Sequence, residues 1–163
     1  MEQWKKLIHI NRNFQKAVNL QLDIGNHRRI ENYIPTRSSM LILQRYLEAV
    51  LGKTKEHATV LIGPYGKGKS HLLLVLLSIL SLDLPTSVFE KINKTDENTA
   101  EQVLQIQQEN KKYLPVLVSS ISGFSMNQIL LFALREALEK NGLTDIVLSR
   151  ILSGPKPSHI QSN

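Results

Sequence analysis

The feature that most constrains this chain is the run Gly-Pro-Tyr-Gly-Lys-Gly-Lys-Ser at positions 63–70. It matches the pattern G-x-x-x-x-G-K-[S/T] at every fixed position. At average residue frequencies, a match by chance in 163 residues is on the order of one in a hundred. Glycines let the backbone bring N–H groups close to phosphate oxygens, and a helix that follows adds the positive end of its dipole. The run therefore predicts a phosphate-binding loop of the Walker A type.

Separate roles are expected for the residues of this loop. Lys69 is expected to reach the β- and γ-phosphates of a nucleotide, and the Ser70 hydroxyl to ligate a metal ion, so ATP and Mg²⁺ are the expected cofactors. Lys67 could contact phosphate or stay solvated, and His71 could contact the ligand or pack locally. The nucleotide-binding residues predicted here are Gly63, Pro64, Tyr65, Gly66, Lys67, Gly68, Lys69, Ser70 and His71, with Ser70 as the metal ligand.

The segments on both sides of the loop predict the fold class. Ala58–Ile62 is short and rich in β-branched residues, which is typical of a strand buried on two sides. A helix is predicted from Lys69 to about Leu82, and because it is apolar almost all round it must be buried. Leu114–Ser119 predicts a second strand. Strands that alternate with helices indicate an α/β fold, here a P-loop NTPase-like parallel sheet flanked by helices.

Helical spacing and capping residues predict the remaining elements. Thr36 or Ser38 can cap a helix that Gly52 ends. A capping-box pattern at residues 99–102 predicts a helix to about Lys112, and Ser125–Gln128 caps a helix that ends near residue 141. The other predicted helices cover residues 11–22, 85–92 and 144–152, and residues 32–35 are predicted to be extended.

Charge and composition divide the chain into three parts. A basic lead-in segment (residues 1–35) precedes the predicted nucleotide-binding domain (36–153), and a flexible tail (154–163) follows. The net charge is +6, and residues 1–60 hold five Lys and five Arg against five acidic residues. Such a basic region can face phosphate, nucleic acid or an acidic partner, or it can be a solvated surface.

Composition also excludes several kinds of protein. The chain has no cysteine, which excludes disulfides, thiolate metal sites and a cysteine nucleophile. Its five histidines lack paired metal-ligand spacing. No signal peptide is visible and the longest apolar run is too short to span a bilayer, so we expect a cytoplasmic protein without a membrane partner.

A second acidic site, which ATP hydrolysis by proteins with this loop requires, is not visible. That site is an apolar strand that ends in Asp or Asp-Glu. The strand predicted at 114–119 ends in serine, and the next acidic residue is Glu136. The predicted fold is therefore incomplete, and the catalytic residues are unknown. We expect the chain to bind ATP and to hydrolyse it very slowly or not at all, so its status as an enzyme is open.

Two stretches of sequence resemble the ATP-binding proteins of bacterial phage-defence islands. They are Asn-Tyr-Ile-Pro-Thr at 32–36 and Leu-Ile-Gly-Pro-Tyr-Gly-Lys-Gly-Lys-Ser-His-Leu-Leu at 61–73, and they resemble the P-loop proteins of BREX-like systems, with a core of the STAND type. The resemblance implies a nucleotide-binding core of the AAA+/ASCE type, with ATP and Mg²⁺. It also implies that Tyr33, Ile34 and Pro35 contact the base. The implied partners are other defence proteins or further copies of the chain, with DNA reached through the complex.

Three functions follow from these patterns. The first is the ATP-binding N-terminal portion of an AAA+-like ATPase of an anti-phage defence system. A module that senses nucleotide and signals to partners without hydrolysis is the second. The third, a small P-loop kinase, is disfavoured because no arginine that could hold a transferred phosphoryl group lies between Arg45 and Arg135.

Overall fold

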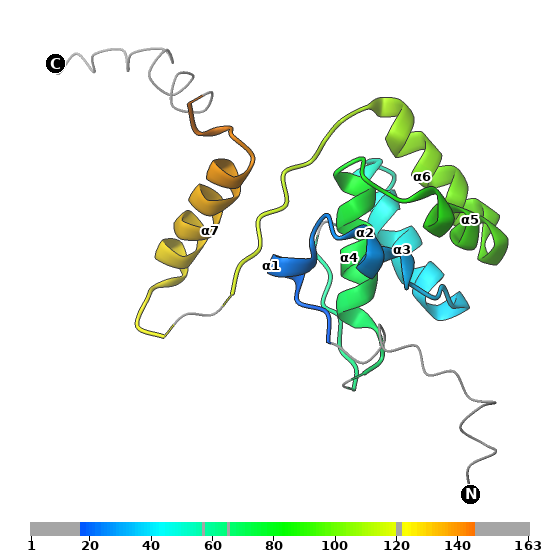
Figure 1. Cartoon of the computed structure of the whole chain (residues 1–163), viewed down its shortest axis with the longest axis horizontal. Coiled ribbons are helices and arrows are strands. Elements are labelled where there is room, and N and C mark those ends of the chain that lie inside the picture. The colour runs from blue at the N-terminus through cyan, green and yellow to red at the C-terminus, as the bar shows by residue number, and fades with distance from the viewer. Residues whose placement is uncertain (1–16, 57, 65, 120–121, 146–163) are drawn as a thin grey trace, which may run out of the picture. The chain divides into compact units, whose positions relative to one another are not determined.

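The computed structural model describes residues 17–56, 58–64, 66–119 and 122–145 (Figure 1). The chain forms two compact units that divide between Tyr113 and Leu114. The first unit contains α1 (Leu20–Asp23), α2 (His27–Glu31), α3 (Arg37–Val50), α4 (Lys69–Leu80), α5 (Thr86–Thr95) and α6 (Glu97–Glu109), and the second contains α7 (Met126–Lys140).

Helix α4 forms the centre of the first unit and packs against α1, α2, α3 and α6 (Figure 1). Residues on several sides of α4 are buried, which confirms the prediction of a buried helix over this range. Helices α3, α5 and α6 each contribute one apolar face, with residues three or four positions apart. The buried apolar side chains of α3 to α6 are Met40, Leu43, Leu47, Leu72, Leu74, Val75, Leu76, Ile79, Val88, Ile92, Ala100, Val103 and Ile106.

Local capping signals set several of the helix ends. Thr36 begins α3 with a capping box, in which its hydroxyl accepts from the Ser39 backbone N–H at 3.2 Å. Ser125 caps α7 in the same way, as predicted. The cap of α6 was wrongly predicted at Thr99: Asp96 accepts from the Thr99 N–H at 2.7 Å, and Thr99 lies buried in the first turn.

The predicted α/β fold with a parallel sheet is wrong. Neither Ala58–Ile62 nor Leu114–Ser119 forms a strand, and the residues that the structure describes form helices and irregular segments. Val60 and Ile62 are 81% and 91% exposed, the opposite of the predicted two-sided burial. A β-branched sequence forms a strand only where a neighbour accepts its hydrogen bonds. Within the first unit the core is filled by helix against helix instead, which also removes the sheet on which the AAA+/ASCE assignment depended.

The ends of the chain can be compared with prediction only in part. The helix predicted over residues 11–22 begins at Leu20 in the described part, and residues 11–16 lie outside it. Helix α2 was not predicted. Most of the helix predicted at 144–152, and the whole tail 154–163, lie outside the described residues. No helix within the described ranges is long and apolar enough to cross a membrane.

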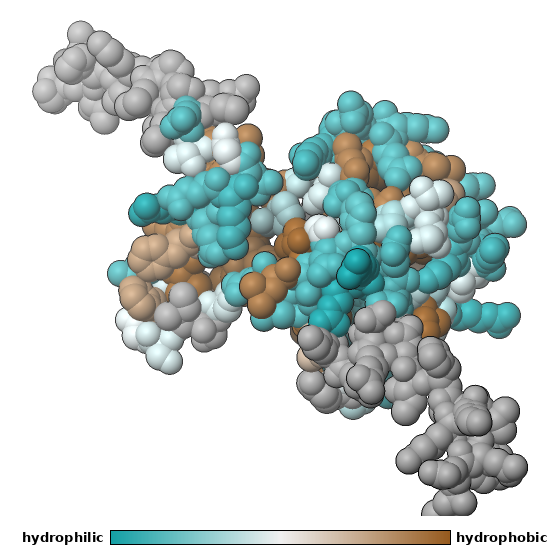
Figure 2. Space-filling model, in the orientation of Figure 1, coloured by the Kyte–Doolittle hydropathy of each residue, from teal (hydrophilic) through white to brown (hydrophobic). Residues whose placement is uncertain are grey.

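Apolar side chains are exposed along α7 in the second unit. Leu130, Leu131 and Phe132 are all exposed there, and Met126 is 73% exposed. Phe124, just before the helix, packs edge-to-face on Phe132 with ring centroids 5.5 Å apart. Figure 2 shows brown, hydrophobic surface on this unit.

Candidate phosphate-binding loop

The backbone of the loop turns twice through a conformation that favours glycine. Gly66 has φ +79° and Gly68 has φ +76°, in the left-handed region that other residues enter at a cost. Gly68 is also the N-cap of α4, and its carbonyl accepts the first helical hydrogen bond, from Leu72 N–H at 2.9 Å. No side chain caps this end of α4. The N–H groups of the first turn therefore have no partner inside the helix and are donors for a ligand.

Lys69 is turned back into the loop. Its ammonium nitrogen donates to the carbonyl oxygens of Gly63 and Pro64, both at 2.8 Å. An ammonium group has three donors, so these two bonds leave one for a ligand. The loop thus curves around the charge of Lys69, the first residue of α4, whose first-turn N–H groups have no partner inside the helix. Positive charge and backbone donors together favour an anion at this place.

The other residues predicted in the loop lie around this charge. Ser70 is exposed on the first turn of α4, and Lys67 is exposed beside Gly68. Tyr65 lies outside the described residues. Within the described part of the chain, no three His, Asp or Glu side chains gather to hold a metal ion. The exposed hydroxyl of Ser70 could contact a metal held mainly by phosphate oxygens.

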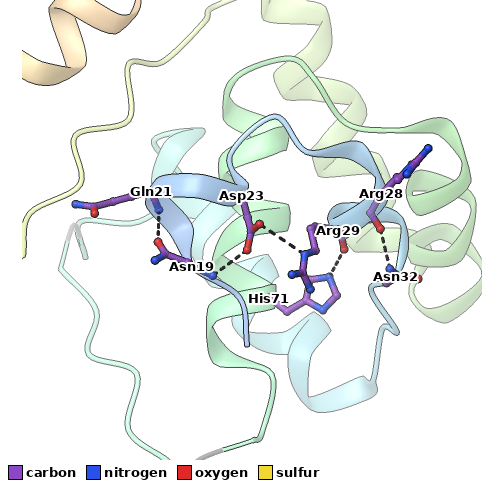
Figure 3. A network of polar contacts seen from close by, with 7 residues as sticks. All are labelled: Asn19, Gln21, Asp23, Arg28, Arg29, Asn32 and His71. Carbon is purple, nitrogen blue, oxygen red and sulfur yellow. Dashed lines mark hydrogen bonds and ion pairs between the residues drawn. The ribbon is translucent and has the colours of Figure 1, made fainter. Parts of the chain in front are cut away.

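His71, the residue after Ser70, joins the first turn of α4 to the lead-in segment. Its half-buried imidazole packs edge-to-face on Tyr33, with ring centroids 5.3 Å apart. Its Nε2 lies 2.7 Å from the Arg29 carbonyl oxygen (Figure 3). Because a carbonyl only accepts, Nε2 must carry the proton and donate. Of the three residues predicted to contact the base, Tyr33 is buried against His71, Ile34 is 65% exposed and Pro35 is half-buried.

Two further side chains hold the lead-in segment in place. The Arg29 guanidinium lies 3.6 Å from the buried Asp23 carboxylate, which also accepts from the Asn19 N–H at 2.8 Å (Figure 3). Lys91 of α5 donates to the Glu31 carbonyl at 2.6 Å and lies 3.5 Å from that of Tyr33. The contacts of His71 with Arg29 and of Lys91 with Glu31 were not predicted, because they join residues 42 and 60 positions apart and no local pattern signals them.

Burial perturbs both aromatic side chains of this contact. Burial lowers the pKa of His71 below its ordinary value, and the positive charges of Arg29 and Lys91 act in the same direction. The bond to the Arg29 carbonyl and the Asp23 charge partly oppose that shift. Burial raises the pKa of Tyr33, and the Ser39 side chain offsets part of the rise. Both groups are therefore held in their neutral forms at neutral pH.

Two acidic side chains near α4 are already engaged. Asp83, just past the end of α4, lies 2.8 Å from His27 Nε2. Asp23 is bound to Arg29 and to the Asn19 backbone, as described above. Both carboxylates therefore have partners within the chain, and neither contacts the loop in these pairs.

Comparisons of the chain with models of protein families, with curated proteins and with solved structures find no match. The resemblance to phage-defence ATPases therefore remains a prediction from the two stretches of sequence that carry it.

Proposed function

We propose that this chain binds the phosphate groups of a nucleoside triphosphate, ATP with Mg²⁺, at residues 63–70 and the first turn of α4. The observation that carries the proposal is the position of Lys69, whose ammonium group is held inside the loop by the Gly63 and Pro64 carbonyls at 2.8 Å. A surface lysine ordinarily extends into water. Here the loop is folded around the charge.

The chemistry of this arrangement suits a polyphosphate. The left-handed turns at Gly66 and Gly68 direct the chain into α4, whose uncapped first turn offers N–H donors. The helix dipole places partial positive charge at the same point. Lys69 adds a full charge and a remaining donor, and Lys67 lies nearby in sequence. A ligand with several negatively charged oxygens gains from all of these contacts, whereas a neutral ligand gains little.

Mg²⁺ fits the same place. This ion keeps several waters and is commonly bound through one or two protein oxygens and the phosphates of its nucleotide. The exposed hydroxyl of Ser70, beside Lys69, can supply the protein oxygen. When bound, the ion would neutralise part of the charge on the β- and γ-phosphates. Lys69 and the N–H groups of the first turn would balance the rest.

The proposed activity is binding without fast turnover. Hydrolysis needs groups that orient water and neutralise charge on the phosphoryl oxygens. Asp83 and Asp23 lie in contacts with His27 and Arg29, which supports a nucleotide-responsive module over a complete ATPase. A place in a phage-defence complex, with other defence proteins or a second copy as partners and DNA reached through the complex, remains a prediction.

Titration calorimetry with Mg²⁺ and ATP, ADP or AMP tests the proposal. We expect affinity to fall from ATP to AMP as phosphates are lost. A hydrogen bond to a charged group contributes about 1.5–3 kcal/mol, so Lys69→Ala is expected to weaken ATP binding about 10- to 150-fold. Lys55→Ala is the matched control, because it removes an exposed lysine outside the loop. Equal ATP affinity of the wild type and Lys69→Ala would exclude a role of the loop lysine. AMP binding as tight as ATP binding would exclude phosphate recognition.

A further inference from the structure

His71 occupies a position from which the phosphate loop and the lead-in segment can influence each other. It lies in the first turn of α4, next to the serine of the loop. Its imidazole is held between the Arg29 carbonyl, at 2.7 Å, and the ring of Tyr33. One side chain thus connects the element that presents N–H donors to the ligand with the segment that precedes α3.

The lead-in segment is fixed on its other sides as well. Asp23 of α1 holds the Arg29 guanidinium at 3.6 Å, and Lys91 of α5 binds the Glu31 carbonyl at 2.6 Å. At the other end of α4, His27 pairs with Asp83 at 2.8 Å. A shift of the first turn of α4 would therefore displace the imidazole against partners that are themselves held. Packed elements of this kind change between discrete arrangements instead of deforming gradually.

Phosphate binding acts on that first turn. A bound anion would draw the N–H groups of the turn toward its oxygens and compete with the Gly63 and Pro64 carbonyls for Lys69. A ligand that prefers one arrangement of the loop shifts the population toward it, and the coupling between the two sites is reciprocal.

We propose that the segment from α1 to Tyr33 (residues 20–33) is ordered by nucleotide binding, and that His71 is the positioning residue that couples it to the phosphate loop. This inference rests on the proposed nucleotide-binding function. In the bound state the His71 bond to Arg29 and the edge-to-face contact with Tyr33 are held in place. In the free state they open more often, and the amides of α1 and α2 exchange faster.

Hydrogen exchange of the full chain, followed by mass spectrometry of peptides from residues 19–36, tests this inference. In the wild type, saturating ATP with Mg²⁺ is expected to slow exchange in these peptides roughly fivefold or more. In His71→Ala, ATP still binds, but with lower affinity and without slowing exchange there. His71→Gln keeps a donor for the Arg29 carbonyl and is expected to restore part of the effect. The control is Lys55→Ala, which removes an exposed side chain outside both the loop and residues 20–33 and should keep the full response.

The outcomes separate this inference from the function on which it rests. If wild-type protein does not bind ATP in calorimetry, the proposed function fails. If ATP binds and exchange over residues 19–36 is the same with and without it, the coupling is refuted, even where His71→Ala does not fold. If His71→Ala folds and retains the full response, or if Lys55→Ala loses it, His71 is not the coupling residue.

Discussion

A substitution at Gly68 tests whether the left-handed turn of the loop affects ligand binding apart from its effect on stability. It has φ +76°, and a Cβ built there meets no atom within 4 Å. Gly52, which follows α3, has φ +69° and the same open surroundings. Alanine at either position is therefore strained by its backbone conformation alone, without a steric clash. Gly52→Ala is thus a matched control for Gly68→Ala.

The expected size of the effect follows from this geometry. The left-handed conformation costs a residue with a Cβ about 1–2 kcal/mol. Alanine also restricts the unfolded chain, which returns about 0.4–1 kcal/mol. We expect Gly52→Ala to lose about 1 kcal/mol in the free energy of unfolding. In Gly68→Ala the free loop can leave the strained turn in part, and binding must then restore it, so the same cost is divided between stability and affinity. If all of the roughly 1 kcal/mol appeared in binding, the affinity would be about fivefold weaker.

Urea unfolding followed by circular dichroism measures the stability, and titration calorimetry with ATP and Mg²⁺ measures the affinity. Gly68→Ala is expected to lose both, whereas Gly52→Ala loses only stability. Unchanged affinity of Gly68→Ala would show that the left-handed turn is no part of the phosphate site. An equal loss of affinity in Gly52→Ala would mean that general destabilisation, and not the loop, weakens binding.

Two further predictions concern the first unit. Asp96→Ala removes the bond to the Thr99 N–H at 2.7 Å and is expected to lower the free energy of unfolding in urea by about 0.5–2 kcal/mol. Asp96→Asn keeps a capping side chain and should be close to wild type. An Asp96→Ala variant as stable as the wild type would show that the cap contributes nothing. Among the described residues, no group forms a well-aligned hydrogen bond with the buried Tyr33 hydroxyl, and Ser39 only weakly affects it, so Tyr33→Phe should leave the stability at neutral pH unchanged or higher. Because burial raises the pKa of Tyr33 above 10.0, the folded state keeps a proton that the unfolded state loses, and stability should fall as pH rises above about 10. That alkaline loss should be smaller in Tyr33→Phe, and an identical pH dependence in both proteins would contradict the reasoning.

The helices were predictable where the signal is local. The apolar residues Met40, Leu43 and Leu47 recur at three- and four-residue steps, and Thr36 lies where an N-cap is needed. The cap of α6 was also within reach of sequence reasoning. Asp ranks above Thr at N-caps, so Asp96 was the better choice in that stretch. The glycine and lysine positions of the loop came directly from the motif.

The sheet could not be judged from local sequence. Val60 and Ile62 have the side chains of a buried strand, but β propensity states only that a residue suits a pleated, partly buried surface. Whether a second strand lies beside it depends on distant parts of the chain. The contact of His71 with Arg29 also depends on a distant part of the chain, since 42 positions separate the two residues. Long-range pairs of this kind carry no signature in one sequence.

The central place of α4 limits how this sequence can change over generations. Most helices of a small protein have a solvent-facing side on which substitutions are nearly neutral. In α4, Leu74, Val75 and Ile79 are fully or almost fully buried, while Lys69 at its start forms the loop. A substitution in the interior of α4 therefore acts on the packing of its neighbours and on the placement of the loop together. Tolerated changes should accordingly come as compensating pairs, with a partner in α3 or α6, while exposed positions such as Leu104 and Gln105 can drift singly.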